Sequence, residues 1–283
     1  MKPNKAFYLS LTISFIFCPI IIFSQYKIFY QYSFIPDLSK KDSLIEEVMV
    51  LDIDFKLQKS IFYNDKKIKV DSIISLTRGS NQKKIEFPDY NPNLTYKIKK
   101  DLIKNNISFH LEYGGVKMKI TENQKPIWKI STDKMELNEL VCQKATTMYK
   151  GREWIAWFTS DIPVSEGPYK FYGLPGLIVK ISDKNNEHIF NLLKILKDQK
   201  NHIEDNDKNE KEINKEMLTK ILNTRYENVN QNIKNFDVTN TGYTIILNDG
   251  NVIHMNKDVK DVEKELEKKV QRQKNPIDLI DGY

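Results

Sequence analysis

The chain has 283 residues, of which 40% are hydrophobic and 29% are charged, as in ordinary folded soluble proteins. The formal net charge is +6, and acidic and basic residues are interspersed, so no basic stripe for nucleic acid stands out. The length suits one large β domain or two small ones.

Residues 1–24 have the layout of a secretory signal peptide. Lys2 and Lys5 give a positively charged start, and a mostly apolar run follows. Ser24 is a small residue just before the expected cleavage point, which makes Gln25 the first residue of the mature chain. An uncleaved membrane anchor is the alternative, since the run approaches the length that spans a bilayer. We favour cleavage, and hence export to the periplasm or the extracellular space with no transmembrane segment remaining.

Strand patterns follow one another along most of the chain. Apolar residues alternate with polar ones over residues 26–34, which indicates a half-buried strand. Gly114-Gly115 separates two strand patterns, and Asn248-Asp249-Gly250 separates two more, which is typical of β-hairpins. Because short connections join successive strands, we expect antiparallel meander pairing.

The composition changes after residue 196. Residues 197–216 are nearly all charged or amide, which predicts a flexible charged insertion. Apolar residues then recur at helical spacing over residues 213–229 and again over 259–270. We therefore expect an α+β fold, a mainly antiparallel, curved, half-barrel-like sheet with a few helices packed on one face. It would form a single β-rich domain over residues 25–272, followed by a tail over residues 273–283.

The most distinctive motif lies in residues 171–179, where two glycines and a proline share nine positions with apolar side chains. Glycine permits close approaches that a side chain blocks, and proline has no N–H to give to a sheet. We expect a sharp bend that feeds a buried strand, and a bend that shapes a ligand cavity or partner surface is the alternative. The motif residues are Gly173, Leu174, Pro175, Gly176, Leu177 and Ile178, with Asp183 downstream.

This motif resembles the signature of the GLPGLI family, exported bacterial proteins without an established activity that are named after these residues. The match is literal over residues 173–178 and extends upstream to Cys142, and it includes Asp183. The resemblance implies export and assigns no reaction. A looser similarity over residues 127–196 to the periplasmic lipoprotein-carrier fold implies an antiparallel half-barrel with an apolar cavity.

Catalytic candidates are few. After signal cleavage Cys142 is the only cysteine, so no internal disulfide is possible. We expect Cys142 to be a small buried apolar group, and a nucleophile would need a histidine partner. Asp161, Glu166 and Asp183 surround the motif and could supply the paired acids of a glycosidase, but turn chemistry explains all three.

Histidines give no metal site. No two of the four lie at metal-ligand spacing on one helix, and no cysteine pair supplements them, so we expect neither a metal nor a cofactor. His110 and Glu112 share one face of a predicted strand, where a cross-strand polar contact is the expected role of each.

Aromatic residues indicate how the protein recognises its target. Trp154 and Phe158 share one face of a predicted strand, and Trp157 lies on the other. A strand that is apolar on both faces is central, or it separates the core from an apolar cavity. Trp154, Trp157 and Phe158 are therefore a candidate apolar binding face.

Our leading hypothesis for function is an exported, non-catalytic binding protein that recognises a hydrophobic ligand or an envelope partner. The alternative is an exported hydrolase that uses Cys142 or the acids near the motif.

Overall fold

A computed structural model of the chain describes residues 25–39, 43–66, 69, 96–113, 116–198, 209–218, 220–221, 243–246, 252–255, 275 and 277–278. The expected signal peptide and the helix expected at residues 259–270 lie outside this part of the chain. Within it, no helix has the length and apolar character needed to cross a membrane.

Strands dominate the described residues. Twelve of them form one sheet in the order β12-β6-β5-β4-β3-β2-β1-β11-β10-β9-β8-β7, and β13 and β14 form a separate hairpin. Their bounds are β1 Gln25–Phe34, β2 Ile45–Asp54, β3 Lys59–Asn64, β4 Lys97–Asp101, β5 Asn106–Tyr113, β6 Val116–Glu122, β7 Lys129–Leu137, β8 Leu140–Tyr149, β9 Arg152–Thr159, β10 Leu177–Asp183, β11 His188–Asp198, β12 Lys211–Glu212, β13 Tyr243–Ile246 and β14 Val252–Met255.

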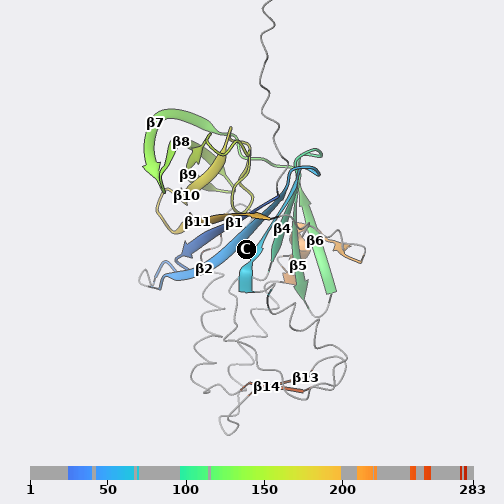
Figure 1. The fold of residues 1–283 in the computed structure, drawn as a ribbon. Coiled ribbons are helices and arrows are strands. Elements are labelled where there is room, and N and C mark those ends of the chain that lie inside the picture. The colour runs from blue at the N-terminus through green and yellow to red at the C-terminus, as the bar shows by residue number, and fades with distance from the viewer. Residues whose placement is uncertain are drawn as a thin grey trace, which may run out of the picture.

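The large sheet consists of two antiparallel meanders joined at β1. Strands β1 to β6 pair in chain order, and so do β7 to β11. Strand β1 pairs with β2 on one side and with β11 on the other, so it connects the two series (Figure 1). The expected antiparallel meander is confirmed, and the short parallel pair β12–β6 is an addition to it.

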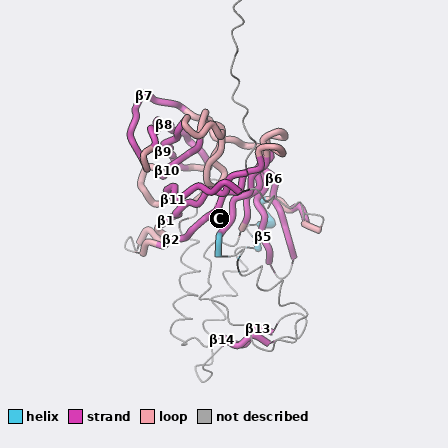
Figure 2. Tube along the Cα trace, viewed as in Figure 1, coloured by secondary structure: helices cyan, strands magenta, loops and turns pink. Residues whose placement is uncertain are grey.

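The expected α+β class is wrong, because the described residues form a large, mainly antiparallel sheet and few of them are helical. Helical residues form only short segments, at residues 65–66 and 215–218 among others (Figure 2). In the described part of the segment with helical spacing after residue 213, residues 215–218 and 220–221 are helical. Asn214 Oδ1 accepts from the Met217 N–H at 2.8 Å, and Ile213 and Leu218 pack on Met118 and Ile120. The β9–β10 connection, residues 160–176, packs on the inner sheet face through Phe171 and Leu174.

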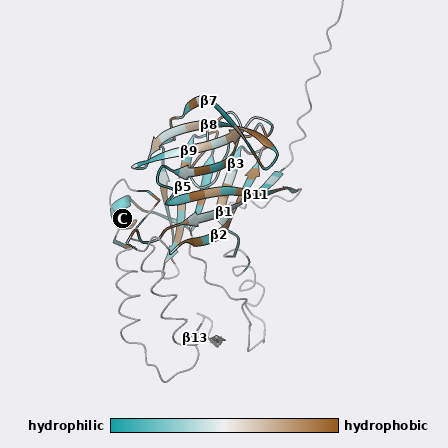
Figure 3. Cartoon of the chain, turned by 90° about the vertical axis from the view of Figure 1, so that its left-hand side faces the viewer, coloured by the Kyte–Doolittle hydropathy of each residue, from teal (hydrophilic) through white to brown (hydrophobic). Residues whose placement is uncertain are grey.

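The main core lies between the inner sheet face and this connection. Apolar residues are interspersed with polar ones along the strands (Figure 3), so one face of each strand can be buried. Tyr32 stacks on Phe190 of the neighbouring strand with ring centroids 4.2 Å apart. Trp154 and Phe171 lie 4.6 Å apart, centroid to centroid, which packs the β9–β10 connection onto the sheet.

The glycine motif forms the bend that leads into β10. The Gly176 N–H donates to the Leu174 carbonyl at 2.8 Å, and Leu177 then pairs with Thr159 of β9. A Cβ atom at Gly176 would lie 2.0 Å from the Thr159 carbonyl oxygen. Gly173 has a φ of +94°, a backbone angle that other residues rarely adopt. Gly176 is therefore required by the close approach of Thr159, and Gly173 by its backbone angle.

We expect Gly176→Ala to lower the free energy of unfolding by about 3 kcal/mol or more, because the added methyl group would overlap the backbone of a paired strand. Urea denaturation measures the change. Gly173→Ala is the comparison, since its methyl group would meet Trp128 only at 3.9 Å and its cost is the backbone angle, about 1–2 kcal/mol. A Gly176→Ala protein as stable as the wild type would contradict this account of the bend.

Candidate functional site

An ion pair between Lys100 and Glu166 lies on the inner face of the sheet. Lys100 belongs to β4 and Glu166 to the β9–β10 connection, and Lys100 Nζ lies 2.5 Å from Glu166 Oε2 with both side chains buried. Lys100 Nζ also donates to the carbonyls of Gly167 at 2.8 Å and Phe171 at 3.3 Å. Burial lowers the pKa of Lys100, and the carboxylate of Glu166 opposes that shift. The three acceptors fix the connection to the opposite meander.

A second buried cluster joins the same connection to β6. Lys170 Nζ lies 3.0 Å from Glu122 Oε1 and 2.6 Å from Asp278 Oδ2, and Lys150 Nζ lies 2.7 Å from Glu122 Oε2. Burial acts to raise the pKa of Glu122, but the ammonium groups of Lys170 and Lys150 outweigh it and the pKa is lowered. Glu122 is therefore ionised between two cations. Asp278 lies in the segment expected to be a tail, yet its side chain is buried.

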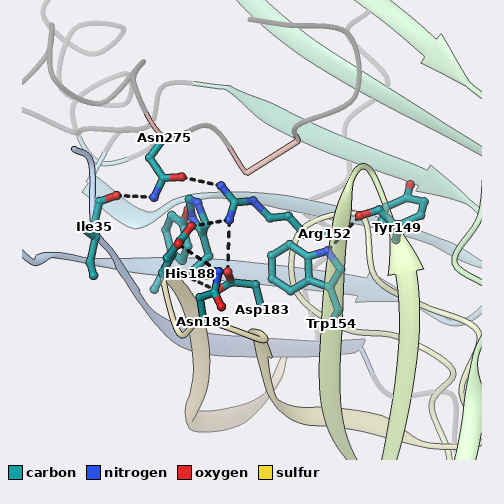
Figure 4. A network of polar contacts seen from close by, with 10 residues as sticks. Ile35, Tyr149, Arg152, Trp154, Asp183, Asn185, His188 and Asn275 are labelled. Carbon is teal, nitrogen blue, oxygen red and sulfur yellow. Dashed lines mark hydrogen bonds and ion pairs between the residues drawn. The ribbon is translucent and has the colours of Figure 1, made fainter. Parts of the chain in front are cut away.

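Arg152 is the centre of a third cluster (Figure 4). Its Nη1 lies 3.2 Å from Asp183 Oδ2 and 2.6 Å from Glu187 Oε2, and Nη2 donates to Asn275 Oδ1 at 2.5 Å. Asn275 Nδ2 donates in turn to the Ile35 carbonyl at 2.7 Å. Burial raises the pKa of Asp183, while the His188 N–H and Arg152 favour its charged form. Asp183 of the motif thus holds the turn between β10 and β11.

His188 is buried beside this cluster. Its Nδ1 lies 2.7 Å from the Tyr32 hydroxyl, and the two rings are stacked. Burial and the charge of Arg152 lower the pKa of His188 to about 3, so the ring is neutral at physiological pH. We assign the neutral His188 ring a structural role, because it packs against the aromatic rings of Tyr32, Phe34 and Trp154.

Other residues singled out in the sequence are distributed over different surroundings. Cys142 is fully buried, and its Sγ donates to the Leu140 carbonyl at 3.5 Å. Burial and the nearby Asp161 carboxylate raise the pKa of Cys142, which disfavours the nucleophilic thiolate. Asp161 is exposed, whereas Glu166 and Asp183 are buried in two separate ion-pair clusters. The described residues contain no group of three or more side chains suited to hold a metal ion.

The three residues of the candidate apolar face are divided between the two sides of the sheet. Trp154 is 1% exposed, packs on Phe171 and donates its Nε1–H to the Tyr149 carbonyl at 3.1 Å. Phe158 is buried in the same core. Trp157 lies on the outer face, where it is partly exposed and partly packed against the core. The inner side of β9 is therefore packed by the protein's own residues, and Trp157 is the member of the set that solvent reaches.

A polar relay on β5 was not foreseen from the sequence. His110 Nδ1 lies 2.7 Å from Glu210 Oε2, and His110 Nε2 lies 2.7 Å from Ser108 Oγ. Glu112, the partner considered from the sequence, pairs in register with Lys117. Ser108 could have been found, because it stands two positions from His110 on the same strand face. Glu210 could not, because it lies 100 residues away in a charged segment without periodicity.

We expect Lys100→Met to lower the free energy of unfolding by about 3–5 kcal/mol, because Glu166 would remain buried without its counter-charge. The double variant Lys100→Met/Glu166→Leu should recover most of that loss, since no lone charge stays in the core. Lys184→Met, which removes the ammonium of the exposed Lys184–Glu153 pair, is the control and should change little. Stability is measured by urea denaturation. Equal losses in the single and double variants would show that the unpaired carboxylate of Glu166 is not the cause of the loss.

We expect protein stability to fall as the pH is lowered from 6.5 to 5. His188 has a folded-state pKa of about 3, below the usual 6.5, so in this window the unfolded chain binds the extra proton and unfolding is favoured. One such group gives a slope of up to about 1.4 kcal/mol per pH unit, partly offset by Asp183, whose raised pKa acts in the opposite direction. His188→Gln should flatten this slope in urea titrations at several pH values. An unchanged slope would contradict the assignment.

Comparisons with known proteins match part of the chain to a family of unknown function and show a similar fold, but they assign no reaction. Residues 111–180, which include the glycine motif, match the family described as "Protein of unknown function (Porph_ging)". The GLPGLI assignment stays a resemblance. No curated protein matches.

Solved structures show likeness in fold alone. A PNGF-II structure in space group C2 is similar with a TM-score of 0.50 and 17% identity, over 70% of this chain and 32% of that one. An uncharacterized conserved protein from Thermus thermophilus has a TM-score of 0.36 and 5% identity, over 68% of this chain and 92% of that one, which is too weak to support an argument. The chain is thus similar, over residues 111–180, to a family of unknown function and, in fold, to part of PNGF-II.

Proposed function

We propose that the protein is an exported binding protein that recognises a partner protein of the cell envelope through the outer face of β8–β10. The observation that carries this proposal is the position of Trp157. It is partly exposed on the outer sheet face, and its cross-strand neighbours are Lys144 of β8 and Lys180 of β10. Tryptophan is among the residues enriched at the centres of protein interfaces.

Apolar side chains continue the same face beyond Trp157. Ile155 stands two residues along β9 with its side chain on the same side, and it pairs with Thr146 and Ser182. Ile189 of β11 follows across Ser182, and both isoleucines are partly exposed. We name this surface, made of Trp157, Ile155, Ile189, Lys144 and Lys180, the Trp157 face. Its apolar centre and basic flanks suit a partner with an apolar patch bordered by acidic residues.

The inner side of the sheet supports binding at the outer face over binding in a cavity. Trp154 and Phe158 pack against the β9–β10 connection, which is fixed by the buried Lys100–Glu166 pair. A hydrophobic ligand at these two residues would have to displace that connection. Hydrolysis by Cys142 is disfavoured by its burial and raised pKa. The acids near the motif have cationic partners of their own or are exposed, so they form no catalytic pair.

We expect Trp157→Ala to abolish partner capture and to lower the free energy of unfolding by about 1–2 kcal/mol, because the side chain is only partly packed against the core. Trp154→Ala is the matched control on the same strand, and it should cost about 3–5 kcal/mol because it truncates a core residue. Capture is measured by placing a photo-crosslinking amino acid at position 155, with and without Trp157→Ala, in the exported protein. Exposed position 139 is the negative control. Crosslinks that are absent at 155, or equal at 155 and 139, would refute the Trp157 face.

A further inference from the structure

We infer that Ser108, His110 and Glu210 form a nucleophilic serine site, directed at negatively charged carboxylic esters, on the opposite meander from the Trp157 face. Ser108 Oγ lies 2.7 Å from His110 Nε2, and His110 Nδ1 lies 2.7 Å from Glu210 Oε2. This is the order of contacts in which a hydroxyl is activated by an imidazole and the imidazole is oriented by a carboxylate.

The contacts determine where the protons lie in the neutral relay. An ionised carboxylate only accepts hydrogen bonds, so His110 Nδ1 carries the hydrogen that is donated to Glu210. In the neutral ring Nε2 is then an acceptor, and the Ser108 hydroxyl donates to it. Glu210 thus selects the tautomer that can take a proton from Ser108.

The base and the carboxylate of the relay are more buried than the serine, as catalysis requires. The side chains of His110 and Glu210 are 6% and 10% exposed, which strengthens their charge-assisted contact. Ser108 is partly exposed, and Thr121, its partner on β6, is exposed. The base and its orienting carboxylate are therefore shielded, while a substrate can reach the hydroxyl from solvent.

The lysines of β4 indicate the charge of the substrate. Residues directly opposite each other in a sheet share a face, and Ser108 pairs with Lys99 of β4 while His110 pairs with Lys97 and Lys119. Lys119 is paired with Glu212 at 3.5 Å, so the ammonium groups of Lys97 and Lys99 on β4 are the ones that favour an anionic ester.

The reaction is an acyl transfer to Ser108 followed by hydrolysis. Ser108 Oγ bonds to the carbonyl carbon as its proton passes to His110 Nε2, and the alcohol leaves with that proton as its C–O bond breaks. Water then attacks the acyl-serine, gives one proton to His110, and releases the acid as Ser108 recovers that proton. Ester and water yield acid and alcohol, and no other reactant is needed.

A fluorophosphonate probe tests the site on the full folded protein. Displacement of fluoride by Ser108 Oγ leaves a stable adduct, which peptide mass spectrometry locates. We expect labelling at Ser108, lost in Ser108→Ala and slowed about 100-fold in His110→Gln, the contribution of a positioned base. Ser131→Ala is the matched control, because Ser131 is a partly exposed strand serine whose hydroxyl accepts only from the Asp133 N–H among the described contacts.

Further measurements separate reactivity from folding. Glu210→Gln keeps the shape of the side chain and should slow labelling at least about 10-fold, with urea denaturation showing that each variant is folded. Mono-4-nitrophenyl succinate should be hydrolysed faster than 4-nitrophenyl acetate, and the difference should shrink at high salt. No adduct at Ser108 in folded protein, or an adduct that forms equally fast in His110→Gln, would overturn the inference. Equal hydrolysis of the two esters would overturn its anionic substrate.

Discussion

The buried Lys100–Glu166 ion pair is the contact on which the arrangement of the sheet depends. The two meanders share hydrogen bonds through β1 and β11, and β4 and β9 lie far apart in the sheet order. Lys100 on β4 reaches Glu166 and two carbonyls of the β9–β10 connection, which holds that connection against the inner face. Two charges are costly to bury unless their hydrogen-bonding capacity is used. Here Lys100 Nζ donates to two carbonyls and lies 2.5 Å from its counter-charge on Glu166.

The other buried clusters also join segments that lie far apart in the sheet. Lys170 of the connection contacts Glu122 at the end of β6, and Arg152 of β9 reaches the Ile35 carbonyl through Asn275. Each cluster joins segments that the hydrogen-bond ladder does not pair. A sheet of this size with little helical cover among the described residues thus gains rigidity from ion pairs as well as from apolar packing. That rigidity makes its outer face a fixed platform.

Local signals in the sequence predicted the strands well, but they did not predict which segments pack on the faces of the sheet. The alternation at residues 26–34 became β1, and the sequence Asn248-Asp249-Gly250 stands between the paired strands β13 and β14. Alternation and turn chemistry act between neighbours, so the sequence reveals them. The described part of the helix expected over residues 213–229 is helical at residues 215–218 and 220–221, whereas the segment that covers the inner sheet face at Trp154 is the irregular β9–β10 connection, which no periodic pattern reveals. Glu166 and Glu210 show the same limit for sites, since their partners are 66 and 100 residues away.

The position of Asn275 has a consequence for how the chain reaches its fold. It bridges Arg152 and Ile35, which are 123 and 240 residues away along the sequence. Strand β1 must likewise wait for β11 before its second edge is paired. Contacts of such separation slow folding, because long loops must close before any of them form. A chain that is exported, as we propose, cannot complete its core until residue 275 has been synthesised. Slow folding of this kind would leave the chain unfolded long enough to enter an export channel.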